Sequence, residues 1–316
     1  MSDLILHQYD TSPFSEKIRA ILGYKAQAYP ELKYQAVQIP VIMPKPTLMP
    51  LTGGYRKTPV MQVGADIYCD TALIAKLIEV KYPDNPIFPT DQIATLGSAA
   101  HWVDTFLFRV SVAMAFQPKA VSISPLFSDP EAAAAFMADR AEFGKGSTQL
   151  SMEFGEAEPH WLLHMRRLDQ QLANNDYLGG DAPSIVDFSN YHCLWFLYGN
   201  EALHGDFEPF TNVLAWMQRI AGFGHGGLTE VSGEAALDIA TKSEPEAIQK
   251  QSQTLNSGPA IGDEVEVLPM DYGFQPTRGT LVVNALEEIA VQRQDEQVGN
   301  LIVHFPRLGF QVRAAG

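Results

Sequence analysis

The chain has little cysteine, with only Cys69 and Cys193 among its 316 residues. Two distant cysteines supply neither a disulfide framework nor the paired spacing of a structural zinc site. The sequence also lacks any run of about 18 apolar residues, and it does not open with a basic segment followed by an apolar stretch. From these absences we expect an unprocessed cytoplasmic protein with no metal and no membrane segment.

Basic residues are also scarce, with 22 Lys and Arg against 37 Asp and Glu and a net charge of −15. The imbalance is uneven, because residues 1–90 carry nine basic against eight acidic side chains, whereas residues 91–257 carry nine against twenty-one. An acidic surface repels nucleic acid and anionic lipid, so we expect neither as a partner. A small anionic ligand meets the least repulsion in the first ninety residues.

Residues 1–83 have the element order of a thioredoxin-like α/β domain. The pattern predicts a strand at 4–9, a helix at 15–25, a strand at 34–39, two strands at 59–63 and 67–69, and a helix starting at Asp70 or Thr71. The dense prolines between Pro40 and Pro50 exclude a long helix or a central strand there. We therefore expect an irregular loop between the second and third strands.

Two further units follow. Residues 92–252 have the periodicity of an all-helical domain, with a capping box from Ser184 to Asp187 at the start of one helix. Residues 258–316 contain five short alternating segments separated by turn residues, which predict a small closed β-barrel or rolled sheet. The helices are expected at 95–116, 130–142, 159–172, 184–197, 210–221 and 234–239, and the strands at 265–268, 279–283, 289–293, 301–305 and 310–312.

The turn between the first strand and the first helix is the first candidate site. It places the Ser12 hydroxyl at a helix N-terminus, where unpaired N–H groups and the macrodipole stabilise an anion. No His or Lys lies close enough in sequence to make this serine a nucleophile, but its hydroxyl can donate to a bound thiolate and lower the thiol pKa from its usual ~8.5. Thr11, Ser15 and Tyr9 are further donors. The alternative is that Ser12 or Thr11 only caps the helix.

The strand that begins at Thr58-Pro59 is expected to lie beside this turn. A cis bond before Pro59 would open the backbone of Val60 to antiparallel pairing with a peptide-like ligand, whereas most X–Pro bonds are trans and the sequence does not distinguish the two. Lys57 or Arg56 can neutralise a ligand carboxylate, although each can equally be an exposed surface charge.

Asp70 and Thr71 stand at a second helix N-terminus, where they can bind an ammonium and a carboxylate or simply cap the helix. The neighbouring Cys69 is either a reactive thiol or an inert side chain in an apolar strand, and its surroundings favour the inert form. His160 and His164 share a helix face, but without an intervening glutamate they are weak evidence for zinc.

Four segments, read together, resemble the glutathione S-transferase superfamily. SPFSEKIRAIL resembles its first-turn motif, and YRKTPVMQVGADIYCDTALIAKLIE resembles its cis-proline strand, hairpin and γ-glutamyl-binding helix. YLGGDAPSIVDFSNYHCLWF resembles the capping-box helix of its helical domain, and FTNVLAWMQRI resembles a later tryptophan-containing helix. The segments occur in the family's order across residues 1 to about 250, so they imply its two-domain fold.

The resemblance also implies roles for individual residues. Ser12 matches the serine that activates the glutathione thiol, and a serine here argues against disulfide exchange. Val60 matches the residue whose main chain pairs with the cysteinyl part, and Lys57 lies where members often hold the glycyl carboxylate. Asp70 and Thr71 occupy the family's Glu/Gln-Ser pair, with Asp70 one methylene shorter.

An aromatic series follows in the helical domain, and its side chains either fill the core or line a substrate pocket. Trp102 and Phe106 from this series, together with Phe14, are the expected pocket residues for a small apolar electrophile. The series comprises Trp102, Phe106, Phe108 and Phe116.

Two functions follow from the resemblance. The first is a glutathione transferase in which glutathione is co-substrate and Ser12 stabilises its thiolate. The second is a non-catalytic relative that serves as a binding or assembly platform, which the shorter Asp70, the proline-rich loop and the added β unit favour. That unit is not a standard part of the family, and its start is only vaguely similar to Src-homology-3-like domains. A homodimer is usual for the superfamily, and the added unit either covers or extends the dimer surface.

Overall fold

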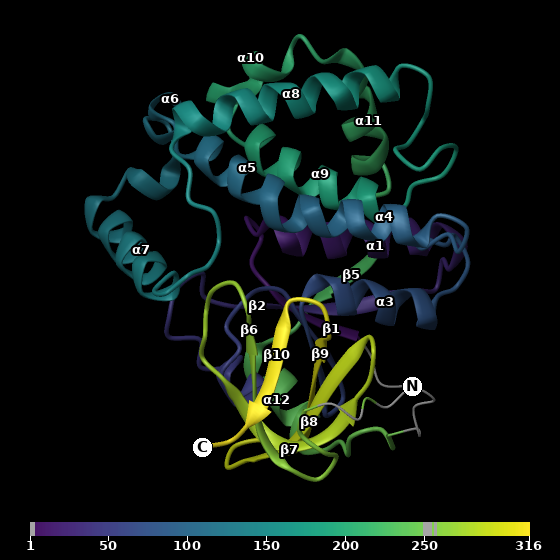
Figure 1. The fold of residues 1–316 in the computed structure, drawn as a ribbon, viewed down its shortest axis with the longest axis vertical. Helices are drawn as coiled ribbons and strands as arrows, with labels where there is room; N and C mark the ends of the chain where they lie inside the picture. Colours follow the sequence, from purple (N-terminus) through teal and green to yellow (C-terminus); the bar gives the residue numbers. More distant parts are fainter. Residues whose placement is uncertain (1–3, 249–254, 256–257) are drawn as a thin grey trace.

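The computed structural model describes residues 4–248, 255 and 258–316, and its first part is the predicted thioredoxin-like unit. Strand β1 lies between β2, which is parallel to it, and β3, which is antiparallel, and β4 pairs with β3 (Figure 1). The proline-rich loop holds one short helix, which tolerates Pro50 because the proline lies in its first turn. The elements are β1 Leu4–Gln8, α1 Pro13–Ala28, β2 Lys33–Gln38, α2 Met49–Thr52, β3 Val60–Val63, β4 Asp66–Cys69 and α3 Thr71–Lys81.

The middle of the chain forms the predicted helical domain, which covers the α1 and α3 face of the sheet (Figure 1). The helix expected at 95–116 is interrupted by a π-helical turn at Val103–Leu107. The helix expected from Pro159 begins five residues earlier, because Glu153 and Glu156 form a capping box. The elements are α4 Ile93–Trp102, α5 Phe108–Ala115, α6 Pro118–Val121, α7 Pro130–Phe143, α8 Phe154–Leu172, α9 Ile185–Tyr198, α10 His204–Phe207 and α11 Thr211–Ala221. The last helix, α12 Gly233–Thr241, packs instead on the opposite face of the sheet.

The predicted capping box at Ser184 is present at the start of α9. The Asp187 carboxylate is fully buried and accepts hydrogen bonds from the backbone N–H groups of Leu178 (2.7 Å) and Ser184 (2.9 Å). It also accepts from the indole Nε1 of Trp216 at 3.0 Å, which lies on α11. One side chain thus fixes the start of α9 and the packing of α11 against it.

The C-terminal extension, residues 258–316, contains the five expected strands, but the closed barrel is not confirmed. Strands β6 to β9 form an antiparallel meander, and β10 returns to pair with β6. Strand β9 then pairs in parallel with β4, so the described strands form one ten-stranded sheet in the order β10-β6-β7-β8-β9-β4-β3-β1-β2-β5. The strands are β6 Glu264–Pro269, β7 Thr277–Asn284, β8 Glu288–Asp295, β9 Gly299–Pro306 and β10 Phe310–Ala314.

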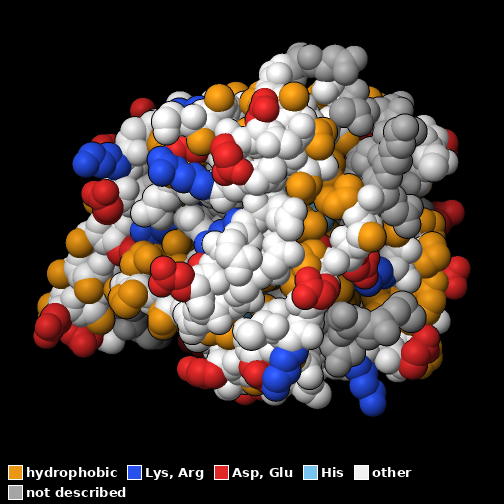
Figure 2. Space-filling model, turned by 90° about the horizontal axis from the view of Figure 1, so that it is seen from below, with side chains coloured by type: hydrophobic (Ala, Val, Ile, Leu, Met, Phe, Trp, Pro, Cys, Tyr) orange, Lys and Arg blue, Asp and Glu red, His pale blue; other side chains and the backbone are white. Residues whose placement is uncertain are grey.

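Strand β5, Gly227–Glu230, was not expected from the sequence and pairs in parallel with β2 at the far edge of the sheet. The second core of the molecule lies on the opposite sheet face from the helical domain and includes Leu237 of α12 with Phe305 and Phe310 of the extension. Seen from below in Figure 2, this end of the molecule carries acidic and basic side chains dispersed among apolar ones.

The expected domain end at residue 252 lies outside the described residues. None of the described helices is both long and apolar enough to cross a bilayer.

His304 of β9 joins the extension to the N-terminal sheet. Its imidazole lies 3.1 Å from the Asp66 carboxylate of β4 and 2.7 Å from the Glu288 carboxylate of β8, and it stacks on Tyr68. Burial alone would lower the pKa of His304, but the hydrogen bonds and charges of the two carboxylates outweigh it and raise the pKa above its ordinary value.

We expect the stabilisation supplied by His304 to depend on pH. Because its pKa is raised in the folded state, the imidazolium contributes fully below the unfolded pKa, and the contribution disappears as pH rises through the folded pKa. Substitution His304→Gln should lower the free energy of unfolding by about 1–3 kcal/mol at pH 6 and by much less at pH 9. Urea denaturation of both proteins at the two pH values measures this. An equal loss at both would contradict a charged His304.

Candidate active site

The Ser12 turn has the geometry expected of an anion-stabilising helix terminus. Ser12 is the N-cap of α1, and its Oγ accepts a hydrogen bond from the backbone N–H of Ser15 at 3.2 Å. Its own N–H donates to the Tyr9 carbonyl at 3.0 Å, and the residue is 2% exposed. A hydroxyl that accepts in the cap retains its own proton for donation. Capping and ligand binding, which the sequence left as alternatives, are therefore compatible in this residue.

The strand beside this turn begins with a cis peptide bond between Thr58 and Pro59. Val60, the next residue, is paired on both sides in the sheet, with His7 of β1 and with Cys69 of β4. Thr58 precedes the cis bond outside both ladders, and its hydroxyl accepts from Lys45 Nζ at 3.0 Å. Thr58 therefore lies next to the Ser12 turn, and its main chain is not paired within the sheet.

Asp70 and Thr71 are at the N-terminus of α3, as predicted. Asp70 has a positive φ of 75°, and its carboxylate accepts from the backbone N–H of Ala72 at 2.9 Å. Burial raises the pKa of the Asp70 carboxyl, and the hydrogen bond from Ala72 and the charge of Lys57 partly oppose this rise. Thr71 is buried as the first residue of the helix.

Lys57 is not an exposed surface charge. Its Nζ is 2.6 Å from the Asp271 carboxylate and lies over the Tyr272 ring, 3.8 Å from its centre. Both partners belong to the connection between β6 and β7 in the C-terminal extension. Burial lowers the pKa of Lys57, and the Asp271 carboxylate counteracts that effect.

Three cations, the buried Lys45 and Arg56 and the half-buried Arg140, form a cluster around Asp139 that was not found from the sequence, apart from Arg56. Arg56 and Arg140 both bind the Asp139 carboxylate, at 2.6 Å and 2.5 Å. Burial and these two guanidinium groups lower the pKa of Lys45 to about 8. Three cations thus surround one carboxylate. Among the described groups, the buried Arg56 Nε has no hydrogen-bond partner.

The same cations affect Tyr9, which the sequence offered as a second hydroxyl. Lys45 Nζ lies 5.7 Å from the centre of the Tyr9 ring. Burial raises the pKa of the Tyr9 phenol, and the charge of Arg140 and a hydrogen bond with Ser12 partly offset this rise. Burial thus keeps the Tyr9 phenol protonated, while Arg140 and Ser12 are the groups here that favour a negative charge. Lys45 lies in the proline-rich loop, where neither helical nor strand periodicity could place it.

The three expected pocket residues lie in two aromatic clusters. Phe14 contacts Phe108 and His192, with ring centres 4.7 Å and 4.5 Å away. Trp102 stacks on Phe106 at 5.3 Å, and this pair packs towards His160 and His164 of α8.

Between the first helix and the helical domain, Asp104 in the π-helical turn binds Lys17 at 2.5 Å and His192 at 3.0 Å. Burial alone would raise the pKa of Asp104, but the Lys17 charge and the His192 hydrogen bond lower it to about 2. The Asp104 carboxylate is therefore ionised and paired within the interface between α1, the π-helical turn and α9.

Neither cysteine is arranged for reactivity. Cys69 and Cys193 are both completely buried, and burial raises the pKa of each thiol well above its ordinary value. The His164 imidazole is 2.7 Å from the amide oxygen of Asn190. Within the described part of the chain, no group of three or more His, Cys, Asp or Glu is arranged to hold a metal ion.

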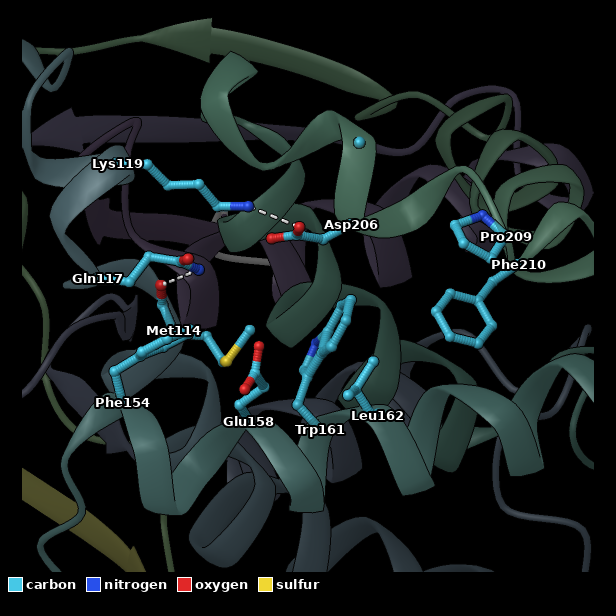
Figure 3. Close-up of a pocket in the computed structure, with 11 residues that line it drawn as sticks. Met114, Gln117, Lys119, Phe154, Glu158, Trp161, Leu162, Asp206, Pro209 and Phe210 are labelled. Carbon is cyan, nitrogen blue, oxygen red and sulfur yellow. Dashed lines mark hydrogen bonds and ion pairs between the residues drawn. The ribbon is translucent and has the colours of Figure 1, made fainter.

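A separate cavity of about 620 Å³ lies within the helical domain (Figure 3). Its walls come from α5, α6, α8 and α10, and an ion pair between Lys119 and Asp206 lies along one side. Trp161 and Phe210 form part of the apolar surface. None of the predicted site residues lines this cavity.

Residues 6–86 match the model of the glutathione S-transferase N-terminal domain, and residues 156–219 match that of its C-terminal domain. A GST-like protein from Pseudomonas syringae is 37% identical, with a TM-score of 0.83 over 99% of this chain and 100% of its own. The chain belongs to the glutathione S-transferase superfamily, as the sequence resemblance implied. Because that alignment spans both chains almost completely, it includes the C-terminal extension.

More distant structures share only part of the chain. The β-etherase LigF from Sphingobium sp. strain SYK-6 is 21% identical, with a TM-score of 0.49 over 70% of this chain and 95% of its own. FzlA from C. crescentus is 16% identical, with a TM-score of 0.49 over 77% of this chain and 94% of its own. No curated protein matches the chain in sequence.

Proposed function

We propose that this protein binds glutathione and conjugates its thiolate to a small apolar electrophile. The observation that carries the proposal is the position of the Ser12 hydroxyl, which lies at the N-terminus of α1 beside the strand that follows the cis Thr58–Pro59 bond. A thiolate there would accept a hydrogen bond from Ser12 and interact with the positive end of α1. The charge of Arg140, which partly offsets the burial-raised pKa of Tyr9 beside Ser12, would also favour that anion.

The rest of the tripeptide is assigned by chemistry. Its γ-glutamyl end would lie at the N-terminus of α3, where Asp70 can pair with the ammonium and the Thr71 N–H can donate to the carboxylate. Its cysteinyl main chain would pair near the cis bond, and we propose Thr58 for this contact in addition to Val60. Its glycyl carboxylate would meet Lys57, or the cations Lys45, Arg56 and Arg140. The electrophile would approach over Phe14, with Trp102 and Phe106 further along the helical domain.

Calorimetry and a conjugation assay test this function. We expect glutathione to produce saturable heat with a dissociation constant of about 1 mM or below, and conjugation of 1-chloro-2,4-dinitrobenzene faster than the uncatalysed reaction. The absence of saturable heat in this range would reject glutathione as the ligand. A homodimer, which the superfamily suggests, is tested by light scattering on the same sample.

One observation favours a second function, a non-catalytic glutathione-binding or assembly protein. The extension is built into the main sheet through the β4–β9 ladder, and its Asp271 and Tyr272 cover Lys57. Saturable glutathione binding without turnover in the same two assays would support this platform role, whereas turnover would support the enzyme.

A further inference from the structure

The connection between β6 and β7, residues 270–276, is held firmly beside the candidate active site. Thr148 donates its backbone N–H to the Asp271 carbonyl at 2.9 Å, and its hydroxyl donates to the Met270 carbonyl at 2.9 Å. Gln149 Nε2 lies 3.2 Å from the second Asp271 carboxylate oxygen. The segment after α7 therefore holds this connection in place, in addition to the ends of its own strands.

The next two residues pack against the end of α7. The Tyr272 ring meets the Phe143 ring edge-on at 5.0 Å, and Gly273 donates its N–H to the Phe143 carbonyl at 3.2 Å. Gly273 has φ +69°, and a Cβ atom there would lie 2.4 Å from the Phe143 ring. The close packing at this position thus requires glycine.

The Asp271 carboxylate binds the same ammonium group that a ligand carboxylate would bind. Lys57 Nζ and Asp271 Oδ1 are 2.6 Å apart, with 13% and 33% of the two side chains exposed. Tyr272 covers the same ammonium group at 3.8 Å, a distance at which the ring face attracts a cation. Lys57 therefore has its charge compensated from within the chain.

We propose that the β6–β7 connection is an internal competitor of the ligand, in which Asp271 takes the place of a ligand carboxylate on Lys57 and Tyr272 covers it. This inference rests on the proposed function, because it takes glutathione as the anion that competes for Lys57. The connection then sets the affinity of the site, since a ligand binds only after Asp271 has given up Lys57.

The substitution Asp271→Asn tests the proposal, because it removes the competing charge and keeps the shape of the side chain. Calorimetry on the full chain should show a glutathione dissociation constant about five-fold lower, or lower still, than that of the unmodified protein. Gly273→Ala, which displaces the connection through the contact with Phe143, should tighten binding in the same direction. Amide hydrogen exchange of residues 270–276 should increase when glutathione binds the unmodified protein.

Glu287→Gln is the matched control. Glu287 also comes from the extension and forms an ion pair with the N-terminal unit, at 2.7 Å from Lys76, but this pair is exposed and lies on α3 away from Lys57. Glu287→Gln should therefore leave the glutathione dissociation constant unchanged. Unchanged or weaker glutathione binding in Asp271→Asn, while the unmodified protein binds, would overturn the competitor and leave the proposed function intact. No binding by any of the four proteins would reject the proposed function and the competitor with it.

Discussion

Replacing Ser12 by alanine is expected to lower the rate of glutathione conjugation by about 100-fold, with about a three-fold or smaller change in the glutathione dissociation constant. In the proposed complex the sulfur is the one part of glutathione that the hydroxyl contacts, so its loss affects the thiolate more than the rest of the tripeptide. The pKa of the bound thiol should rise, and the pH–rate profile should move to higher pH. Steady-state kinetics with 1-chloro-2,4-dinitrobenzene across pH measure both effects.

Two further variants separate this role from helix capping. The Ser12 oxygen caps α1, so alanine alone also weakens the helix start. Ser12→Gly keeps most of the N-cap stability without any side-chain donor and should remain as slow as the alanine variant. Thr11→Ala removes the exposed neighbouring hydroxyl and should keep the original rate. Recovery of activity in Ser12→Gly would assign the loss to the cap and exclude Ser12 as the thiolate donor.

The largest effect on stability is expected for Asp187→Ala, which should lower the free energy of unfolding by about 3–5 kcal/mol. The substitution leaves the N–H groups of Leu178 and Ser184 and the Trp216 indole buried without their acceptor. Urea denaturation measures the change. Asp206→Ala, which removes one side of the partly exposed Lys119–Asp206 pair, is the control and should cost about 1 kcal/mol or less. If Asp187→Ala also lowered the free energy of unfolding by only about 1 kcal/mol or less, the role of Asp187 in joining α9 to α11 would be contradicted.

Local patterns predicted the elements of the fold well where the signal lay within one segment. The alternation of the five C-terminal segments predicted their strands, and the residues between Ser184 and Asp187 predicted the start of α9. The partners of those strands were not predictable in this way. Alternation places side chains on the two faces of a strand, but it does not show whether β9 closes onto its own unit or pairs with β4. Strand β5, with the sequence Gly-Leu-Thr-Glu, is too short and too polar to give a periodic signal.

The residues of the candidate site likewise fall into two groups, those predictable from local sequence and those that meet only in the folded chain. Ser12, Pro59, Asp70 and Thr71 stand in local turns and helix starts, so their positions followed from capping and proline chemistry. Asp271 lies 214 residues from its partner Lys57, in a connection that has no periodic pattern. Lys45, Asp139 and Arg140 likewise meet only through folding. Sequence spacing carries no information on such pairs, and contacts from the structure were required.

The parallel ladder between β4 and β9 has a consequence for synthesis of the chain. It joins Asp66 to Ile302, so the partner of β4 leaves the ribosome more than two hundred residues later. Until then, the row of main-chain groups along β4 stays open to strands of other nascent chains. Shortened messages that stop before residue 299 would leave this edge permanently bare, so early termination should yield insoluble product rather than a smaller folded protein.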